Sequence, residues 1–317
     1  MVALTSVFHT IVFAAVCSNA APLVEKRDVQ ADVFDRAKLM AQYAAAAYCP
    51  SNFGSPGDQL NCPSGGCRAV EDADASTVIE YSRSETPTDV TGFVAVDHSN
   101  KLIVVSFRGS STIDSWLTNL NLEMTPTDIC PDCSAHRGFW NSWTDARDRV
   151  LPAVKQAGTT YPTYQIVVTG HSLGAAIATF AAAQLRNSGY TVALYNYGSP
   201  RIGGTKICQY ITDQPGGNYR FTHWNDPVPK LPLLIMGYKH ISPEYYIEKR
   251  NGEDVQPSDI KVFQGLVNLR GNSAWIAVDV EAHRWYFGRM YTCDAKRSSR
   301  GLQIRDVEEG IDVLATF

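Results

Sequence analysis

One five-residue segment, Gly170-His171-Ser172-Leu173-Gly174, constrains this chain more than any other feature. A short apolar run, Ile166 to Thr169, precedes it and predicts a buried strand. An alanine-rich stretch from Ser172 to Asn187 predicts a helix directly after it. A serine between glycines at such a junction is typical of a sharp strand-to-helix elbow, in which the missing side chains leave room for neighbouring backbone. The alternative interpretation is a glycine-rich turn with a capping serine.

The surrounding pattern predicts one α/β domain. Another apolar run, Val192 to Tyr197, follows the helix, and a strand, helix and strand at this spacing form a right-handed crossover with parallel pairing. Upstream, the runs Gly92 to Asp97 and Leu102 to Phe107 predict a hairpin. Two further helices are expected over Asp32 to Tyr48 and over Ser142 to Gln156. We find no internal repeat and no linker between two cores. The 317 residues are therefore expected to form a mixed, mostly parallel sheet covered by helices.

A serine hydroxyl is a weak nucleophile until a base takes its proton and an acid holds that base. In hydrolases with this elbow, the chain order is serine, acid, histidine. Asp226 follows the strand-like segment Tyr219 to His223, and we choose it as the acid. A turn or capping aspartate is the alternative for this residue. Ser172 and Asp226 are thus the first two members of a candidate triad.

Three histidines follow Ser172, and chain order separates them. His223 precedes the acid and is excluded. His240 lies only 14 residues after Asp226, whereas His283 leaves room for another crossover, so His283 is preferred as the base. His240 is expected to have a structural role, as are His136 and His171.

An oxyanion hole and a lid are also expected. The backbone N–H of Leu173 is one donor by the geometry of the elbow, and Ser110, just after the strand Leu102 to Phe107, is the second. Apolar residues at helical spacing follow Ser110 and form one stripe: Ile113, Trp116, Leu117 and Leu120. A surface helix packed on the core is the alternative, but the position beside Ser110 favours a lid that opens at a lipid surface.

Processing signals frame the domain. Residues 1–21 contain an apolar stretch followed by small residues, which predicts a signal peptide and a secreted protein. Residues 22–27 end in the dibasic pair Lys26-Arg27 and predict a propeptide, so the mature chain is expected to begin at Asp28. The chain has no later run of about 18 apolar residues, so no transmembrane segment is expected. The net charge of −4, with no dense basic run, argues against a nucleic-acid partner.

The motifs together resemble the secreted filamentous-fungus triacylglycerol lipases of lipase class 3, most closely the Rhizomucor and Thermomyces type. The resembling segments occur in family order and are Ala45-Ala46-Ala47-Tyr48-Cys49, Asp89-Val90-Thr91-Gly92-Phe93, Ser106-Phe107-Arg108-Gly109-Ser110, the elbow, Asn196-Tyr197-Gly198-Ser199-Pro200-Arg201, Asn225-Asp226-Pro227-Val228-Pro229 and Ala282-His283.

The resemblance implies a single-domain α/β-hydrolase fold over residues 28–293. It implies the triad Ser172, Asp226 and His283, the oxyanion donors Ser110 and Leu173, and a supporting role for Tyr48. An acyl-enzyme mechanism without cofactor or metal, acting on triacylglycerol at an oil–water interface, is expected, with no obligatory protein partner. Ala175, where many family members have glycine, also occurs in the feruloyl esterase branch. Feruloyl esterase, phospholipase A1 and mono- or diacylglycerol lipase therefore remain alternatives.

The chain has eight cysteines, and the signal peptide contains one of them, Cys17. The resemblance implies three disulfides, Cys49–Cys293, Cys62–Cys67 and Cys130–Cys133. Cys208 is left as a free thiol that we expect to be buried. Residues 294–317 extend past the usual end of the family and are expected to be a C-terminal extension, for which removal by processing and packing on the domain are the two alternatives.

Overall fold

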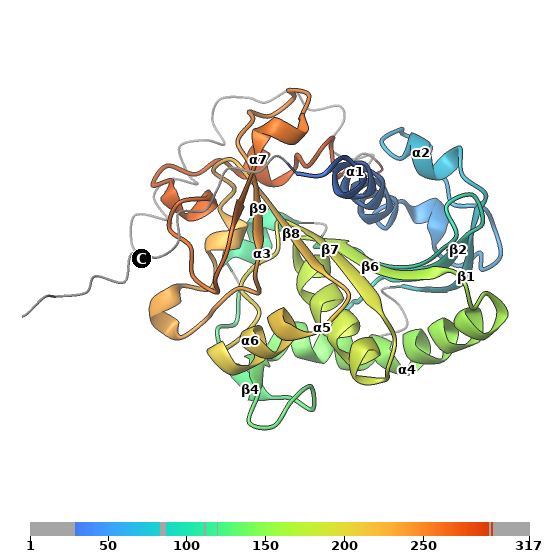
Figure 1. Cartoon of the computed structure of the whole chain (residues 1–317), viewed down its shortest axis with the longest axis horizontal. Coiled ribbons are helices and arrows are strands. Elements are labelled where there is room, and N and C mark those ends of the chain that lie inside the picture. Colours follow the sequence, from blue (N-terminus) through green and yellow to red (C-terminus); the bar gives the residue numbers. More distant parts are fainter. Residues whose placement is uncertain (1–28, 83–86, 111, 119, 292, 294–317) are drawn as a thin grey trace, which may run out of the picture.

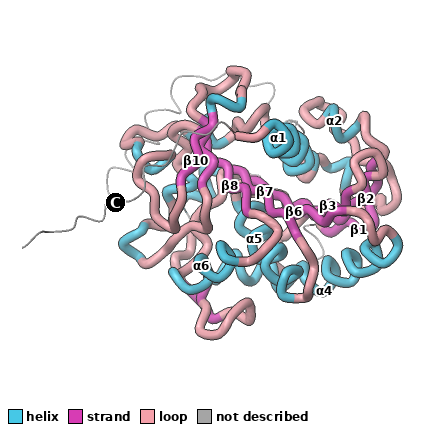
Figure 2. Tube along the Cα trace, viewed as in Figure 1, coloured by secondary structure: helices cyan, strands magenta, loops and turns pink. Residues whose placement is uncertain are grey.

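A central eight-stranded sheet organises the fold, in the order β1-β2-β3-β6-β7-β8-β9-β10 (Figures 1 and 2). The computed structural model describes residues 29–293 except 83–86, 111, 119 and 292, so the expected signal peptide, propeptide, Cys17 and C-terminal extension lie outside the described residues. The strands of this sheet are β1 (Ala75–Tyr81), β2 (Gly92–Asp97), β3 (Leu102–Phe107), β6 (Gln165–His171), β7 (Val192–Tyr197), β8 (Asn218–His223), β9 (Glu244–Ile247) and β10 (Ile260–Phe263).

The sheet is mixed, as expected. Strands β3, β6, β7, β8 and β9 pair in parallel, while β1, β2 and β10 join the two edges in antiparallel pairs. The observed bounds of β2, β3 and β7 match the predicted runs. The β6–β7 crossover predicted around the elbow is present, with α5 (Leu173–Asn187) between the two strands.

Helices cover both faces of the sheet (Figure 1). Helix α1 (Ala31–Ala46) lies on one face, and α4 (Arg137–Thr160) and α5 lie on the other. Side chains alternate between the two faces along a strand, and the core is accordingly divided in two: Phe93 packs with the α1 side and Val94 with the α4 and α5 side. The remaining helices are α2 (Arg68–Glu71), α3 (Ile113–Thr118), α6 (Thr205–Asp213) and α7 (Val280–His283), with short 3₁₀ helices at Pro50–Asn52, Val228–Lys230, Leu234–Met236, Pro257–Asp259 and Asn272–Ala274.

Helix α4 is longer than predicted at both ends, since the prediction covered only Ser142 to Gln156. Its N-terminus is capped by His136, whose side chain accepts a hydrogen bond from the Phe139 N–H. Histidine is not among the usual capping residues, and Gly138 lowers the helix propensity of the first turn. The sequence pattern therefore did not indicate that the helix begins at Arg137. A small second sheet, β4 (Met124–Pro126) with β5 (Ser134–His136), leads into the helix.

All three implied disulfides are present: Cys49–Cys293, Cys62–Cys67 and Cys130–Cys133. Cys208 is free and fully buried, and burial raises the pKa of its thiol to about 12. Such a thiol stays protonated and is chemically inert. Within the described part of the chain, every helix is too short or too polar to cross a membrane.

Candidate active site

The elbow forms at the end of β6 as predicted. Ser172 has a φ of 59°, a backbone conformation that costs energy for any residue other than glycine. A Cβ at Gly170 would lie 2.4 Å from the Gly174 carbonyl oxygen, and a Cβ at Gly174 would lie 2.1 Å from the Phe107 carbonyl oxygen. The two glycines are therefore required for β3, β6 and α5 to approach one another. Ser172 is presented at the first turn of α5, beside the positive end of the helix dipole.

The structure brings Asp226 and His283 together across 57 residues of sequence. The His283 Nδ1 atom lies 3.0 Å from Asp226 Oδ1 and 2.9 Å from Oδ2, and both side chains are fully buried. The same carboxylate accepts a hydrogen bond of 2.8 Å from the Val228 N–H and one of 2.5 Å from the Tyr286 hydroxyl. These donors orient the carboxylate toward the imidazole. An aspartate at Nδ1 holds the proton there and leaves Nε2 free to accept one.

Ser172, the third member of the candidate triad, lies beside the end of β7. The Ser172 N–H donates to the Tyr197 carbonyl at 2.9 Å, and the next residue, Gly198, lies against the other two members of the triad. A Cβ on Gly198 would be 2.9 Å from His283 Cε1 and 3.0 Å from Asp226 Oδ2. Ser172 Oγ and His283 Nε2 are both buried without a hydrogen-bond partner in the described part of the chain. These are the two atoms between which a serine hydrolase must transfer a proton.

Tyr48 and His171 form a hydrogen-bonded chain that ends at the main chain of His283, the predicted base. The Tyr48 hydroxyl lies 2.8 Å from His171 Nδ1, and His171 Nε2 lies 2.8 Å from the His283 carbonyl oxygen. The nitrogen facing the carbonyl must carry the proton, so the hydroxyl donates to Nδ1. Burial, with a smaller contribution from His283, lowers the pKa of His171 well below its usual range. His171 therefore stays neutral and fixes the main chain of His283.

The other histidines are structural donors or acceptors. His240 Nε2 lies 2.7 Å from the Pro229 carbonyl, and His223 Nδ1 lies 2.8 Å from the Ala282 carbonyl. His136 is the helix cap described above. Chain order therefore selected, of the three later histidines, the one whose ring is bonded to the carboxylate of the predicted acid.

The predicted oxyanion donors flank Ser172. Leu173 is the first residue of α5. Ser110 follows Gly109, whose Cβ position lies 2.9 Å from Ser172 Cβ and 2.2 Å from the Tyr48 hydroxyl. Gly109 thus allows the loop after β3 to pass directly over the serine. This is the location that a second oxyanion donor requires.

Helix α3 is shorter than the predicted stripe. Ile113, Trp116 and Leu117 lie on it, but Leu120 lies beyond its end and was wrongly placed on the helix. Directly after Leu120, the side chain of Asn121 accepts a hydrogen bond from the Glu123 N–H, and such local turn bonds compete with helix continuation.

The stripe is turned toward the protein body. Ile113 is 1% exposed, while Trp116 and Leu117 are half-buried. The Trp116 ring stacks on Phe139 with centroids 6.2 Å apart, and Arg284, next to His283, lies 3.6 Å from Asp114 of the helix. Helix α3 therefore packs on the protein body next to the segment that contains His283.

Comparison with known proteins identifies the family. The model of the family Lipase (class 3) matches residues 104–236. The secreted mono- and diacylglycerol lipase A of Penicillium cyclopium is 45% identical over 269 residues, which cover 83% of this chain and 88% of the relative. The chain belongs to the class 3 lipases. It is a carboxylic ester hydrolase, and the name of the relative agrees with the secretion expected from the first 21 residues.

Solved structures show the same fold in other lipases. The mono- and diacylglycerol lipase from Aspergillus oryzae has 44% sequence identity and a TM-score of 0.79, covering 82% of this chain and 98% of that one. The Rhizomucor miehei lipase has 26% identity and a TM-score of 0.73, covering 84% of each chain. The expected α/β-hydrolase fold is confirmed.

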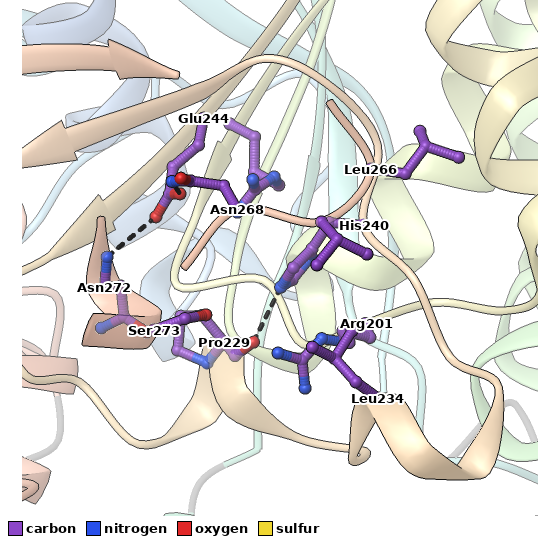
Figure 3. Close-up of a pocket in the computed structure, with 11 residues that line it drawn as sticks. Arg201, Pro229, Leu234, His240, Glu244, Leu266, Asn268, Asn272 and Ser273 are labelled. Atoms are coloured by element: carbon purple, nitrogen blue, oxygen red, sulfur yellow. Dashed lines mark hydrogen bonds between the residues drawn. The ribbon is translucent and has the colours of Figure 1, made fainter. Parts of the chain in front are cut away.

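In this lipase a buried polar cluster supports the acid loop (Figure 3). Arg201 and Arg220 lie there beside Glu244, each less than 5% exposed. The Glu244 carboxylate accepts hydrogen bonds from the Thr222 hydroxyl and the Asn272 N–H, and Asn272 Nδ2 donates to the Asp226 carbonyl at 2.9 Å. The free space in the cluster is about 10 Å³, which holds about one water. The cavity is therefore too small for a substrate, and the cluster contacts the predicted acid, Asp226, through its main-chain carbonyl.

Among the described residues one group has the spacing of metal ligands. The sulfur atoms of Cys49, Cys62 and Cys293 lie within 4.8 Å of one another. All three are in disulfides and offer no thiolate to a metal.

Sequence reasoning missed two parts of the site, Tyr286 and the clearance at Gly198. Tyr286 lies three residues after the predicted base, so that its hydroxyl and the His283 ring converge on one carboxylate. A glycine directly after a strand at the carboxyl edge of the sheet was the signal available for Gly198.

Proposed function

We propose that this lipase hydrolyses acylglycerols, with a preference for mono- and diacylglycerols, through a covalent acyl-enzyme. The observation that carries the chemistry is the buried Asp226–His283 pair, which leaves His283 Nε2 without a hydrogen-bond partner among the described residues, as Ser172 Oγ also is. The preference for partial glycerides is supported by the names of the relatives at 44–45% identity. It replaces the expectation of a triacylglycerol lipase as the first hypothesis.

The reaction has two halves. Ser172 Oγ attacks the ester carbonyl carbon while His283 Nε2 takes the hydroxyl proton, and Asp226 stabilises the imidazolium that forms. The oxyanion accepts hydrogen bonds from Leu173 N–H and Ser110. Collapse of the tetrahedral intermediate breaks the ester bond, and the glyceryl oxygen leaves with the proton from His283. Water then repeats the sequence, releasing the fatty acid and restoring Ser172.

Labelling and variants test this assignment. A fluorophosphonate is expected to label the wild-type chain at Ser172 and to fail on Ser172→Ala, which should lose at least about 10³-fold in kcat. Ser142→Ala is the matched control, because Ser142 is also a buried serine but lies on α4 with its hydroxyl bonded to the Gly138 carbonyl. Full activity of Ser172→Ala, or an equal loss in the control, contradicts the assignment.

Initial rates on emulsified monoolein, diolein, triolein and phosphatidylcholine, and on methyl ferulate, test the substrate class. We expect the two partial glycerides to react faster than triolein. A faster rate on triolein than on the partial glycerides supports a triacylglycerol lipase instead. The highest rate on methyl ferulate supports a feruloyl esterase, and the highest rate on phosphatidylcholine supports a phospholipase A1.

We also propose that α3 is a lid. Its stripe is turned to the body in water, and lipid offers the same side chains an alternative apolar environment. Trp116→Ser is expected to weaken the closed state, so activity on dissolved short-chain esters rises and the rate jump at the solubility limit shrinks. The exposed neighbour Thr112→Ala is the control. An unchanged jump in Trp116→Ser refutes the lid.

A further inference from the structure

Large apolar side chains are exposed at one part of the surface. Ile276 is fully exposed, Ile235 is 92% exposed and Leu269 is 65% exposed. With three neighbours they form what we call the apolar platform: Leu233, Ile235, Met236, Leu269, Trp275 and Ile276. A soluble protein rarely exposes such a cluster unless it binds something there.

The two segments that carry the platform are in contact with each other. The Lys230 ammonium donates to the Trp275 carbonyl, which joins the first segment to the second. Leu234 and Leu266 line the same small cavity from opposite segments (Figure 3). Both segments lie at the left side of the molecule as drawn in Figure 1.

The platform is also connected to the candidate active site. Its first segment continues directly from Asp226, and its second segment leads into α7, which ends at His283. Asn272, at the start of the 3₁₀ helix before Trp275, donates to the Asp226 carbonyl. A surface seated on the platform therefore lies beside the triad.

The charge of these segments differs from that of the whole chain. Residues 227–239 and 263–278 contain three cationic residues, Lys230, Lys239 and Arg270, and no aspartate or glutamate, whereas the chain has a net charge of −4. Among the described residues, no carboxylate forms an ion pair with any of the three. Arg270 instead lies over the Phe263 ring at 5.2 Å. Apolar side chains interspersed with cations that have no carboxylate partner are typical of a segment that binds an anionic lipid surface.

We propose that the apolar platform docks this lipase on lipid surfaces that carry negative charge. The choice of lipid as occupant rests on the proposed function. Hydrolysis of an ester at neutral pH leaves a fatty-acid carboxylate at the surface, so docking strengthens as product accumulates. The platform is exposed while α3 is closed, and docking therefore precedes lid opening.

Vesicle flotation of the full Ser172→Ala chain tests the proposal without turnover. We compare vesicles of phosphatidylcholine alone with vesicles that also contain phosphatidylglycerol or oleate, at low and at high salt. Binding to both anionic mixtures is expected to be about tenfold tighter or more at low salt, and salt is expected to remove the difference. Equal binding to neutral and anionic vesicles overturns the proposal, and so does binding to oleate but not to phosphatidylglycerol, which indicates a fatty-acid pocket.

Two pairs of variants separate the apolar and the charged parts. Ile235→Ser with Ile276→Ser is expected to abolish binding to every vesicle, and Lys239→Gln with Arg270→Gln is expected to lose only the anionic increment. The control, Lys101→Gln with Lys155→Gln, makes the same change in net charge on exposed residues of other elements. A loss in the control equal to that in Lys239→Gln with Arg270→Gln overturns the proposal.

A second copy of the chain is the competing occupant. Sedimentation equilibrium that shows a dimer, converted to monomer by Ile235→Ser with Ile276→Ser, overturns the lipid assignment. Failure of the proposed function can be told apart from failure of the docking proposal. An inactive wild-type chain that still floats with anionic vesicles contradicts the proposed reaction and leaves the docking proposal standing.

Discussion

His136→Asn should change how the stability of this lipase depends on pH. His136 is 2% exposed, caps α4 and stacks on the Phe139 ring with centroids 3.7 Å apart. Its Nδ1 atom accepts the Phe139 N–H, so the folded state needs this nitrogen unprotonated. Burial lowers the pKa of His136 from 6.5 to about 4.

The sign of the effect follows from proton uptake. Between pH 6.5 and 4 the unfolded chain binds a proton at His136 and the folded chain does not, so the free energy of unfolding falls as the pH falls. The shift from 6.5 to about 4 corresponds to about 3 kcal/mol in total, of which about 2 kcal/mol is lost between neutral pH and pH 4.5. Asparagine is a good capping residue that does not titrate, so His136→Asn keeps the cap and removes this pH dependence.

Urea unfolding at pH 7 and at pH 4.5, with the disulfides intact, measures the difference. The drop in unfolding free energy between the two pH values should be smaller in His136→Asn than in the wild type by about 2 kcal/mol. The other buried histidines are the same in both proteins, so their contributions to the drop cancel. Phe139→Leu controls for the lost ring stacking and should lower stability equally at both pH values. An identical drop in wild type and His136→Asn would refute the burial argument.

Two further predictions concern the acid and the longest disulfide. Tyr286→Phe removes a hydrogen bond to the Asp226 carboxylate, worth about 1.5–3 kcal/mol, so kcat on a dissolved ester should fall about 10- to 100-fold with little change in KM; an unchanged kcat contradicts the positioning role. Replacing both Cys49 and Cys293 by alanine opens a ring whose ends are 244 residues apart, which should lower the unfolding free energy by about 5 kcal/mol in urea titrations. The matched loss for the pair Cys62–Cys67, 5 residues apart, is about 2 kcal/mol, and equal losses for the two pairs would contradict the loop-entropy account.

The centre of the fold was predictable because each central strand is buried on both faces. The runs that became β2, β3 and β7 are continuous apolar stretches ended by turn residues, so their bounds could be read directly. Strands β1, β9 and β10 were missed. They lie at or next to the sheet edges, their burial is incomplete, and β9 contains the buried Glu244, whose place in a strand depends on its hydrogen bonds to residues far along the chain.

The site was predictable to the extent that chain order and local sterics determine it. The elbow follows from two glycines and a change of periodicity, and chain order led to Asp226 and His283. The contact of Tyr286 with Asp226 spans 60 residues and depends on how α7 packs, which no local pattern encodes. The end of α3 was missed for a related reason, since the apolar spacing of Leu120 continues after the backbone has left the helix.

Binding to the lipid surface and opening of α3 are separate steps, because the exposed platform serves the first and the half-buried stripe of α3 serves the second. A single apolar surface would combine them. Ile235 and Ile276 are already in water when α3 is closed, so lipid contact at the platform needs no prior conformational change. Turning α3 outward instead exposes Trp116 and the buried Ile113, at a cost of about 1.5–3 kcal/mol for each side chain that moves fully into water. A lipid surface held against the platform removes that cost, because the stripe then moves from protein to lipid. Substitutions in the platform should therefore change binding to the surface, while substitutions in α3 change the rate after binding.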